Sequence, residues 1–295
     1  MTLGKKRIMT AYAFLFIPVL YFVFSRFFPV IETIIMGFTN RRLQAANAQF
    51  IGLDNFKILF TDEVFIKTIS NTVHYTIIGV PLVLAVSLFI AIQLNSITRA
   101  KGFFRLIYLL PYVTPAVAVS WVWRWLFQPV PAGLINNLLV HLGIPVQSFL
   151  MHPSSALYSI LAVKIWVDLG FCIIVFVAGL NNIPSDYIEA AKIDGASNLI
   201  LFKNITLPLL FPVILFLLMR EGISFLRIFT QIYNMTFQAS GGPLDSTKSI
   251  VMFIYQAAFS QFKMGLAASA STVLFFLMIP IILLQIKYFN WKVSY

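Results

Sequence analysis

Charged residues are scarce in this chain of 295 residues: Asp, Glu, Lys and Arg together make up 11% of it. Soluble domains carry about 25%. Hydrophobic residues account for 60% of the sequence, and no part without apolar runs is long enough for a separate soluble domain of about 100 residues. The composition therefore excludes a soluble globular protein and predicts an integral membrane protein.

Signatures of catalysis and metal binding are also missing. No Walker A sequence, G-x-x-x-x-G-K-[ST], occurs, so the chain cannot supply its own ATP hydrolysis. The three histidines, His74, His141 and His152, are far apart and lack metal-ligand spacing. Neither H-E-x-x-H nor a nucleophile elbow is present. We therefore expect no catalytic residue, no metal site and no cofactor bound by this chain.

The single cysteine, Cys172, lies in an apolar run and cannot form an intrachain disulfide. The net charge of +11 would suggest nucleic acid in a soluble protein, but in a membrane chain it reflects Lys and Arg beside the spans. No nucleic-acid partner is expected. Lys5-Lys6-Arg7 precedes an apolar run that is too long for a signal peptide and lacks a small-residue cleavage site, which predicts a retained first helix.

Six apolar stretches reach the roughly 20 residues that a membrane-spanning helix needs. They predict an all-α integral membrane protein with one transmembrane domain over residues 1–295. The stretches cover about 9–38, 71–94, 104–127, 156–180, 207–233 and 265–289.

The basic residues between these stretches indicate the orientation. With a cytoplasmic N-terminus, that side carries Lys5, Lys6, Arg7, Arg99, Lys101, Arg105, Lys192, Lys203, Lys287 and Lys292. The other side carries Arg41, Arg42, Lys57, Lys67, Lys248 and Lys263. Since basic residues concentrate in cytoplasmic loops, we expect a multi-pass protein of the cytoplasmic (inner) membrane with its N-terminus in the cytoplasm.

The longest polar interruption of the second half, residues 181–208, reads NNIPSDYIEAAKIDGASNLILFKNITLP. Pro184 is expected in the first turn of a helix, with Ser185 or Asp186 capping its free N–H groups. Gly195 should end this helix in a left-handed or tight turn, because glycine adopts that conformation without steric cost. The segment therefore predicts a folded loop rather than a linker.

Seven positions of this segment match, at the right spacing, the EAA loop of ABC importer permeases. The string EAAKIDGAS…F…ITLP resembles the carbohydrate-uptake, maltose-type branch of that family. In that family the loop forms two coupling helices that dock in a groove of a cytoplasmic ATPase. We expect the second helix at 197–203, before the chain turns at Leu207-Pro208. The resemblance implies ATPase-coupling roles for Glu189, Ala190, Ala191, Asp194, Gly195, Ile205, Leu207 and Pro208.

The resemblance also implies a function and partners. The chain would be a permease subunit that translocates a carbohydrate, such as an oligosaccharide, delivered by an extracytoplasmic binding protein. A second, non-identical permease subunit would complete the pore, and two ATPase subunits would bind ATP and Mg. Two alternatives remain open: an ABC importer for a non-sugar solute such as glycerol phosphate, and an ATP-independent secondary transporter, which would leave the EAA loop unexplained.

Ionisable residues inside the predicted spans are costly and therefore informative. Lys164 and Asp168 are four residues apart and can neutralise each other, as a structural ion pair or as a ligand site. Arg220 and Glu221 point about 100° apart on a helix, so we expect different partners for them and a place along the pathway. Snorkelling alone could explain Arg124 and Arg227, while Arg26 has no assigned role. The five basic against two acidic residues of this set leave acidic oligosaccharides open as substrates.

Hydrogen-bonding and aromatic side chains for a sugar are available at the end of the fifth stretch, in Gln231, Tyr233 and Asn234. With Arg220 and Glu221 they form the predicted substrate pathway. The small residues of 265–271 favour close helix packing, which we expect against another permease subunit. A short amphipathic segment is expected at 50–60, and helical spacing of leucines is present at 133–143, both outside the spans.

Overall fold

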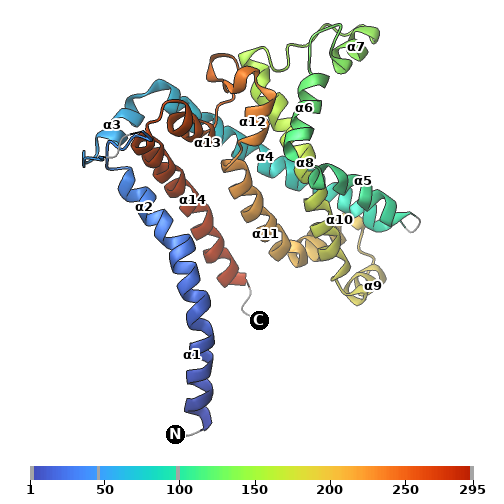
Figure 1. Cartoon of the computed structure of the whole chain (residues 1–295). Coiled ribbons are helices and arrows are strands. Elements are labelled where there is room, and N and C mark those ends of the chain that lie inside the picture. Colours follow the sequence, from blue (N-terminus) through green and yellow to red (C-terminus); the bar gives the residue numbers. More distant parts are fainter. Residues whose placement is uncertain (1–2, 45–46, 98–99, 293–295) are drawn as a thin grey trace. The chain divides into compact units, whose positions relative to one another are not determined.

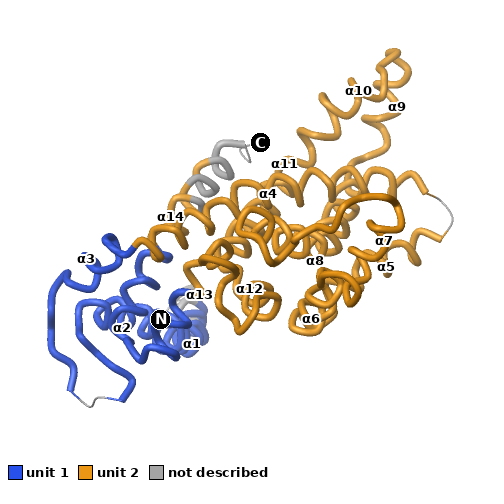
Figure 2. Tube along the Cα trace, turned by 90° about the horizontal axis from the view of Figure 1, so that it is seen from above, with its two compact units in different colours: residues 1–62, 253–275 blue, residues 63–252, 276–295 orange. Residues whose placement is uncertain are grey.

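The computed structural model describes residues 3–44, 47–97 and 100–292, so Arg99 of the orientation argument lies outside the described part. Within these residues the chain forms helices and a single isolated β-bridge, between Thr39 and Phe50. Figure 1 labels the helices. The chain divides into two compact units (Figure 2), residues 1–62 with 253–275 and residues 63–252 with 276–295.

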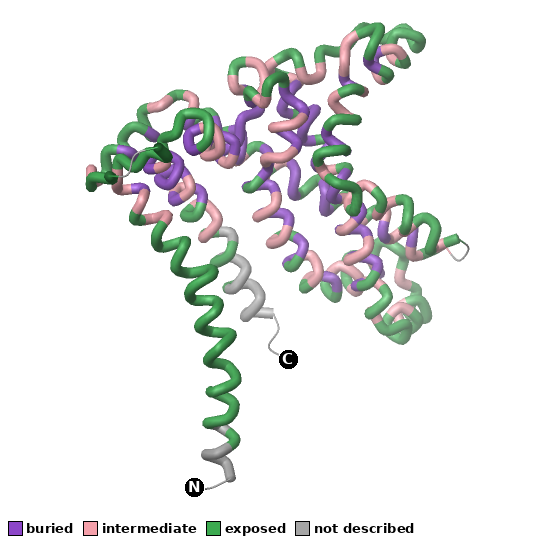
Figure 3. Tube along the Cα trace, viewed as in Figure 1, coloured by how far each residue is buried: buried purple, intermediate pink, exposed green. Residues whose placement is uncertain are grey.

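Unit 1 begins with a long helix built from α1 (Leu3–Phe22), the π-helical turn η1 (Val23–Phe27) and α2 (Phe28–Met36). The wide turn lies just before Pro29, whose missing N–H and bulky ring would otherwise disrupt the α-helical hydrogen bonds. The segment Met9–Met36 is long and apolar enough to cross a membrane, and none of its most apolar window is buried (Figure 3). Arg26 is exposed within η1.

The rest of unit 1 holds α3 (Asp54–Thr61), a helix that begins within the amphipathic segment 50–60. The side-chain amide of Asn55 donates to the carbonyl oxygens of Gly37 and Thr39, both at 2.9 Å. A Cβ on Gly265 would lie 2.0 Å from the Thr39 oxygen. The small-residue run therefore packs against the end of α2 in the same chain, and its expected use against another subunit is wrong for this face.

Unit 2 is built around α8 (Pro153–Asn181), which packs against α4 (Glu63–Ser96), α5 (Lys101–Val113) and α11 (Leu207–Leu226). In the most apolar window of α8, 61% of residues are buried, as expected of a helix that is hydrophobic all round. Gly170 permits the close approach of α5, since a Cβ there would lie 2.1 Å from the Tyr108 oxygen.

The second predicted span, 71–94, is longer in the structure. Helix α4 has 34 residues, or about 51 Å at 1.5 Å per residue, which exceeds the roughly 30 Å of bilayer hydrocarbon. It begins directly after Asp62, whose backbone is extended. The predicted span omits residues 63–70 because a criterion of apolar length does not register helical turns that carry charged side chains, such as Glu63 and Lys67.

The third predicted span, 104–127, is not one helix. Helix α5 ends at Val113, α6 (Ala116–Leu126) follows, and the two are bent by 93°. Thr114 is extended, with φ −73° and ψ 139°, because the ring of Pro115 disfavours helical geometry at the preceding residue. Pro115 is visible in the sequence as a signal for this break. The span 104–127 was predicted from its apolar length alone, which does not register such a break.

The fifth predicted span, 207–233, is shifted toward the N-terminus. Helix α10 (Asn198–Leu201), the π-helical turn η2 (Phe202–Thr206) and α11 form one helix, Asn198–Leu226. The expected turn at Leu207-Pro208 is therefore wrong. As at Pro29, a π-helical turn precedes the proline and accommodates it within the helix.

By length and composition, four described helices could cross a membrane, or five if the bent α5–α6 pair is one span. The four are Met9–Met36, Glu63–Ser96, Pro153–Asn181 and Asn198–Leu226. The sixth predicted stretch, 265–289, corresponds to α14 (Met264–Lys292), whose described apolar part, Met264–Pro280, is shorter. The structure is thus an all-helical membrane protein. The other elements are α7 (Leu134–His141), α9 (Ser185–Ile193), α12 (Thr230–Met235), η3 (Phe237–Ala239), η4 (Pro243–Asp245), α13 (Ile250–Tyr255) and η5 (Gln256–Ser260).

Candidate functional site

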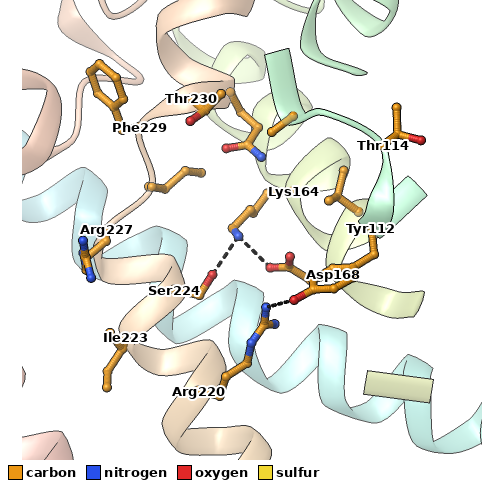
Figure 4. A pocket seen from close by; sticks show the side chains of 14 residues that line it. Tyr112, Thr114, Lys164, Asp168, Arg220, Ile223, Ser224, Arg227, Phe229 and Thr230 are labelled. Carbon is orange, nitrogen blue, oxygen red and sulfur yellow. Dashed lines mark hydrogen bonds and ion pairs between the residues drawn. The ribbon is translucent and has the colours of Figure 1, made fainter. Parts of the chain in front are cut away.

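A polar cavity of about 560 Å³, which we call the α5–α6 cavity, lies in unit 2 beside the break between these two helices (Figure 4). Its walls come from that break, from α8, from the C-terminal half of α11 and from residues 227–231. Four charged side chains line it, one carboxylate and three cations: Asp168, Lys164, Arg220 and Arg227.

Lys164 and Asp168 form the ion pair that their spacing predicts, with Nζ 2.7 Å from a carboxylate oxygen. Both side chains are at most 10% exposed. The Lys164 ammonium also donates to the Ser224 hydroxyl at 2.8 Å, which links α8 to α11. The pair is therefore structural and also part of the cavity wall, so the two interpretations left open by the sequence do not exclude each other.

Arg220 and Glu221 pair with each other, so the expectation of different partners is wrong. Helix geometry separates the directions of neighbouring Cβ atoms, but the long arginine side chain can turn back toward its neighbour. The Arg220 guanidinium also donates to the Tyr112 hydroxyl at 3.0 Å and lies 4.3 Å from the Phe171 ring centroid. Glu221 is fully buried, accepts a hydrogen bond from the Cys172 thiol at 3.2 Å, and is absent from the cavity lining.

Arg227 and Gln231 both line the cavity. Helix α11 ends at Leu226, and the Arg227 backbone leaves the helical region at φ −101° and ψ 18°. The Arg227 side chain is exposed and has no ion-pair or hydrogen-bond partner among the described residues. Arg227 therefore contributes an unneutralised positive charge to the cavity.

Tyr233 and Asn234, the other two predicted pathway residues, do not line the cavity. The Tyr233 ring lies 5.3 Å from the Phe229 ring, and the Asn234 amide donates to the Thr230 carbonyl at 2.8 Å. Phe229 and Thr230 line the cavity instead, because the early end of α11 changes which residues face it. The sequence analysis did not single out Tyr112 and Thr114, which also line the cavity. Pro115 was the available signal, because it marks the helix break beside which they lie.

The EAA loop (residues 181–208) contains α9 and α10 joined by an elbow. Gly195 has φ +80°, which confirms the predicted left-handed turn. Pro184 precedes α9 in an extended conformation, and neither Ser185 nor Asp186 caps that helix, so this part of the prediction is wrong. The side-chain cap is found on α10, where the Ser197 hydroxyl accepts from the Ile200 N–H at 3.4 Å.

The eight predicted coupling residues occupy two places in this loop. Five lie on α9 and its elbow, where all but the half-buried Ala191 are exposed: Glu189, Ala190, Ala191, Asp194 and Gly195. Three lie on the continuous second helix: Ile205, Leu207 and Pro208. Large apolar side chains nearby are also exposed, Ile193 by 87% and Leu199 by 74%. Exposed apolar groups on a charged loop are typical of an interaction site.

Comparison with known proteins places this architecture in a family. Residues 83–292 match the model of the binding-protein-dependent transport system inner membrane component. The chain belongs to this family. It is thus a multi-pass inner-membrane permease of an ABC importer, as the EAA motif indicated. It is a transport subunit and not an enzyme, and ATP is bound by a partner ATPase. Membership also decides against the ATP-independent secondary transporter.

Relatives of known sequence and structure agree with this assignment. The probable ABC transporter permease protein YesP of Bacillus subtilis (strain 168) is 36% identical over 99% of this chain and 94% of its own. The sn-glycerol-3-phosphate transport system permease protein UgpA of Escherichia coli O6:K15:H31 is 35% identical over 84% of this chain and 83% of its own. A chain of a bacterial alginate ABC transporter shares the fold, with a TM-score of 0.83 at 24% identity, covering 97% of this chain and 96% of that chain.

Proposed function

We propose that this permease imports a carbohydrate, in particular an oligosaccharide that carries carboxylates, with the α5–α6 cavity as part of its route. The cavity offers donors and acceptors together: the Lys164 ammonium, the Asp168 carboxylate, the Gln231 amide and the Tyr112 hydroxyl. Sugar hydroxyls require both kinds of partner. Aromatic rings for stacking on a sugar are present in Phe229 and Tyr112.

The observation that carries the acidic substrate is the charge balance of this cavity. Lys164 is neutralised by Asp168, and Arg220 by Glu221. Arg227 keeps its charge, since it has no partner among the described residues. An unpaired guanidinium recognises planar carboxylates by two parallel hydrogen bonds. The fold neighbour that transports alginate supports this substrate class. The alternative, glycerol phosphate, is favoured by UgpA and fits the same charge.

Arg227→Gln tests the proposal in the reconstituted importer with its binding protein. Removing one charged hydrogen bond of about 1.5–3 kcal/mol should lower uptake of an oligouronate about tenfold or more, while uptake of a neutral oligosaccharide of equal length stays within about twofold. Uptake of glycerol phosphate, measured in parallel, distinguishes the alternative. Equal uptake of the oligouronate by Arg227→Gln and the unmodified complex would contradict the role of this charge.

The EAA loop supplies the coupling part of the proposal. Glu189, Ala190 and Gly195 would transmit ATPase closure to the spans through α9, its elbow and the continuous helix that follows. The exposed Ile193 and Leu199 support a docked partner. The complete importer would hold two ATPase subunits, a second and non-identical permease subunit, and an extracytoplasmic binding protein. Purification of the tagged chain from its native membrane should recover the ATPase and the second permease, and recovery of the chain alone would contradict this composition.

Six spans with a cytoplasmic N-terminus complete the proposal, the broken α5–α6 pair and the full α14 each counting as one. Single cysteines at Thr2 and Ser197, in a Cys172→Ala background, should then be labelled from the same side of the membrane. A membrane-impermeant thiol reagent applied to intact and inverted vesicles measures this. Labelling from opposite sides would contradict an arrangement in which three spans and the α5–α6 pair, four crossings together, separate the first cysteine from the second.

A further inference from the structure

The basic residues on the predicted extracytoplasmic side oppose the usual charge bias of membrane proteins, so their surroundings are informative. Three of the six have partners. Lys57 pairs with Asp54 at 3.1 Å, Lys248 with Asp245 at 2.5 Å, and the Lys67 ammonium donates to the Leu244 carbonyl at 2.7 Å. The remaining three have no side-chain partner among the described residues: Arg41, Arg42 and Lys263.

These three unpartnered cations line one cavity of about 250 Å³ in unit 1, which we call the basic cavity. None of its described lining residues is acidic. Two backbone hydrogen bonds hold its walls together: Gly265 N–H donates to the Arg41 carbonyl at 2.9 Å, and Leu43 N–H donates to the Phe262 carbonyl at 3.1 Å. Three like charges are thus brought together by the backbone, and an anion would offset their repulsion.

The basic cavity lies at the ends of two apolar helices. Arg41 and Arg42 follow the candidate span Met9–Met36 by a few residues, and Lys263 directly precedes α14. Close in sequence to its lining residue Ile51 are two exposed apolar side chains, Phe50 at 77% and Leu53 at 58%. Aromatic and apolar groups next to cations are typical of the level of lipid headgroups.

We propose that the basic cavity binds the phosphate of an anionic phospholipid in the extracytoplasmic leaflet. The charge selects an anion, the volume fits a headgroup, and the exposed apolar residues contact its acyl chains. A lipid fits better than an acidic patch of the binding protein, because the cations adjoin the helix ends rather than a part of the chain far from the bilayer. This role is separate from the substrate route.

Lipid titration of the purified importer complex, followed by native mass spectrometry, tests the proposal with three probes: dioleoylphosphatidylglycerol, dioleoylphosphatidylcholine and inorganic phosphate. Each basic residue near an anionic lipid should contribute about fivefold to affinity. Lys263→Gln should therefore weaken phosphatidylglycerol binding about fivefold, and Arg41→Gln/Arg42→Gln/Lys263→Gln about a hundredfold. Phosphatidylcholine should bind the unmodified complex more weakly than phosphatidylglycerol.

Lys57→Gln is the matched control, since it removes one lysine charge from the same predicted side and leaves the basic cavity intact; it should change phosphatidylglycerol binding less than twofold. Equal losses in Lys57→Gln and Lys263→Gln would overturn the site in favour of general surface charge. Phosphatidylglycerol binding unchanged in the triple variant would also overturn it, and weaker docking of the binding protein in that variant would then assign the cations to a protein contact. Competition by inorganic phosphate alone, without lipid preference, would make the site one for free phosphate and refute the lipid assignment.

Discussion

The EAA loop and the α5–α6 cavity use charge in opposite ways. On α9 the carboxylates Asp186 and Glu189 are exposed, beside uncovered apolar side chains. At the cavity the charges are paired and largely withdrawn from solvent: Lys164 with Asp168, and the half-buried Arg220 with Glu221, which lies buried behind the lining. The loop leaves carboxylates and apolar side chains exposed, where a partner protein could cover them. The charged side chains at the cavity have ion-pair partners within the chain, apart from Arg227.

This difference determines how a substitution acts in each region. An exposed side chain can change without disturbing folding, because little packing or desolvation depends on it. A buried charge that loses its partner destabilises the fold and the function together. Variants of the loop should therefore separate transport from stability, and variants of the wall should not.

The largest expected effect is in the loop, with Glu189→Lys. If the loop docks as proposed, reversing a charge there costs several kcal/mol, so uptake should fall about a hundredfold while the thermal unfolding temperature of the permease chain itself stays unchanged. Uptake into proteoliposomes, ATP hydrolysis and unfolding are measured on the same preparation. The control Asp186→Lys reverses an exposed charge in the first turn of the same helix and should retain most uptake. If uptake fell equally in the two variants, the cause would be the net charge of the loop and not the position of Glu189 in the EAA motif.

The same difference explains what could be predicted from the sequence. The EAA loop is contiguous, so its left-handed glycine, its helices and its family were recognisable within twenty-eight residues, 181–208. The α5–α6 cavity is assembled from residues between Tyr112 and Gln231. Arg220 and Gln231 of the predicted pathway line it, and the sequence singled them out because an intramembrane charge and a polar helix end stand out against apolar surroundings. Glu221, Tyr233 and Asn234 do not line this cavity, because the direction of their side chains depends on a side-chain conformation and on where α11 ends.

Local chain breaks account for the other errors of the fold prediction. Hydropathy averages over about twenty residues, so it located the apolar stretches but not the break at Pro115 or the continuous helix through Pro208. Both prolines were visible, yet their outcomes differ: the backbone leaves the helix before Pro115, and a π-helical turn preserves it before Pro208. A proline in the sequence therefore does not by itself decide between the two outcomes.

The cavity wall supplies the second prediction, with Arg220→Ala. It leaves the fully buried Glu221 carboxylate without its partner, so the free energy of unfolding should fall by about 3 kcal/mol together with uptake. Thermal unfolding of the purified complex measures the first change. Arg220→Met/Glu221→Gln removes both charges at similar volume and should recover most of the stability.

The double variant also distinguishes a pathway role of Arg220 from a structural one. If the guanidinium contacts substrate, uptake stays low in the double variant although stability returns. Recovery of both uptake and stability would show that the Arg220–Glu221 pair serves the fold alone. The loop and the cavity wall would then differ only in how much their substitutions change the free energy of unfolding.

The smallest expected effect tests how tightly the wall is packed. Gly170→Ala adds a Cβ that would lie 2.1 Å from the Tyr108 oxygen, so α5 must move away from α8, at a cost of about 1–3 kcal/mol. The matched control is Gly102→Ala on α5, where an added Cβ meets nothing within 4 Å. This substitution should stabilise the helix by about 0.5–1 kcal/mol. Thermal unfolding should therefore shift in opposite directions in the two variants. A shift in the same direction would mean that α5 is not held against α8, and that the cavity beside Tyr112 lacks the rigid wall that a substrate route requires.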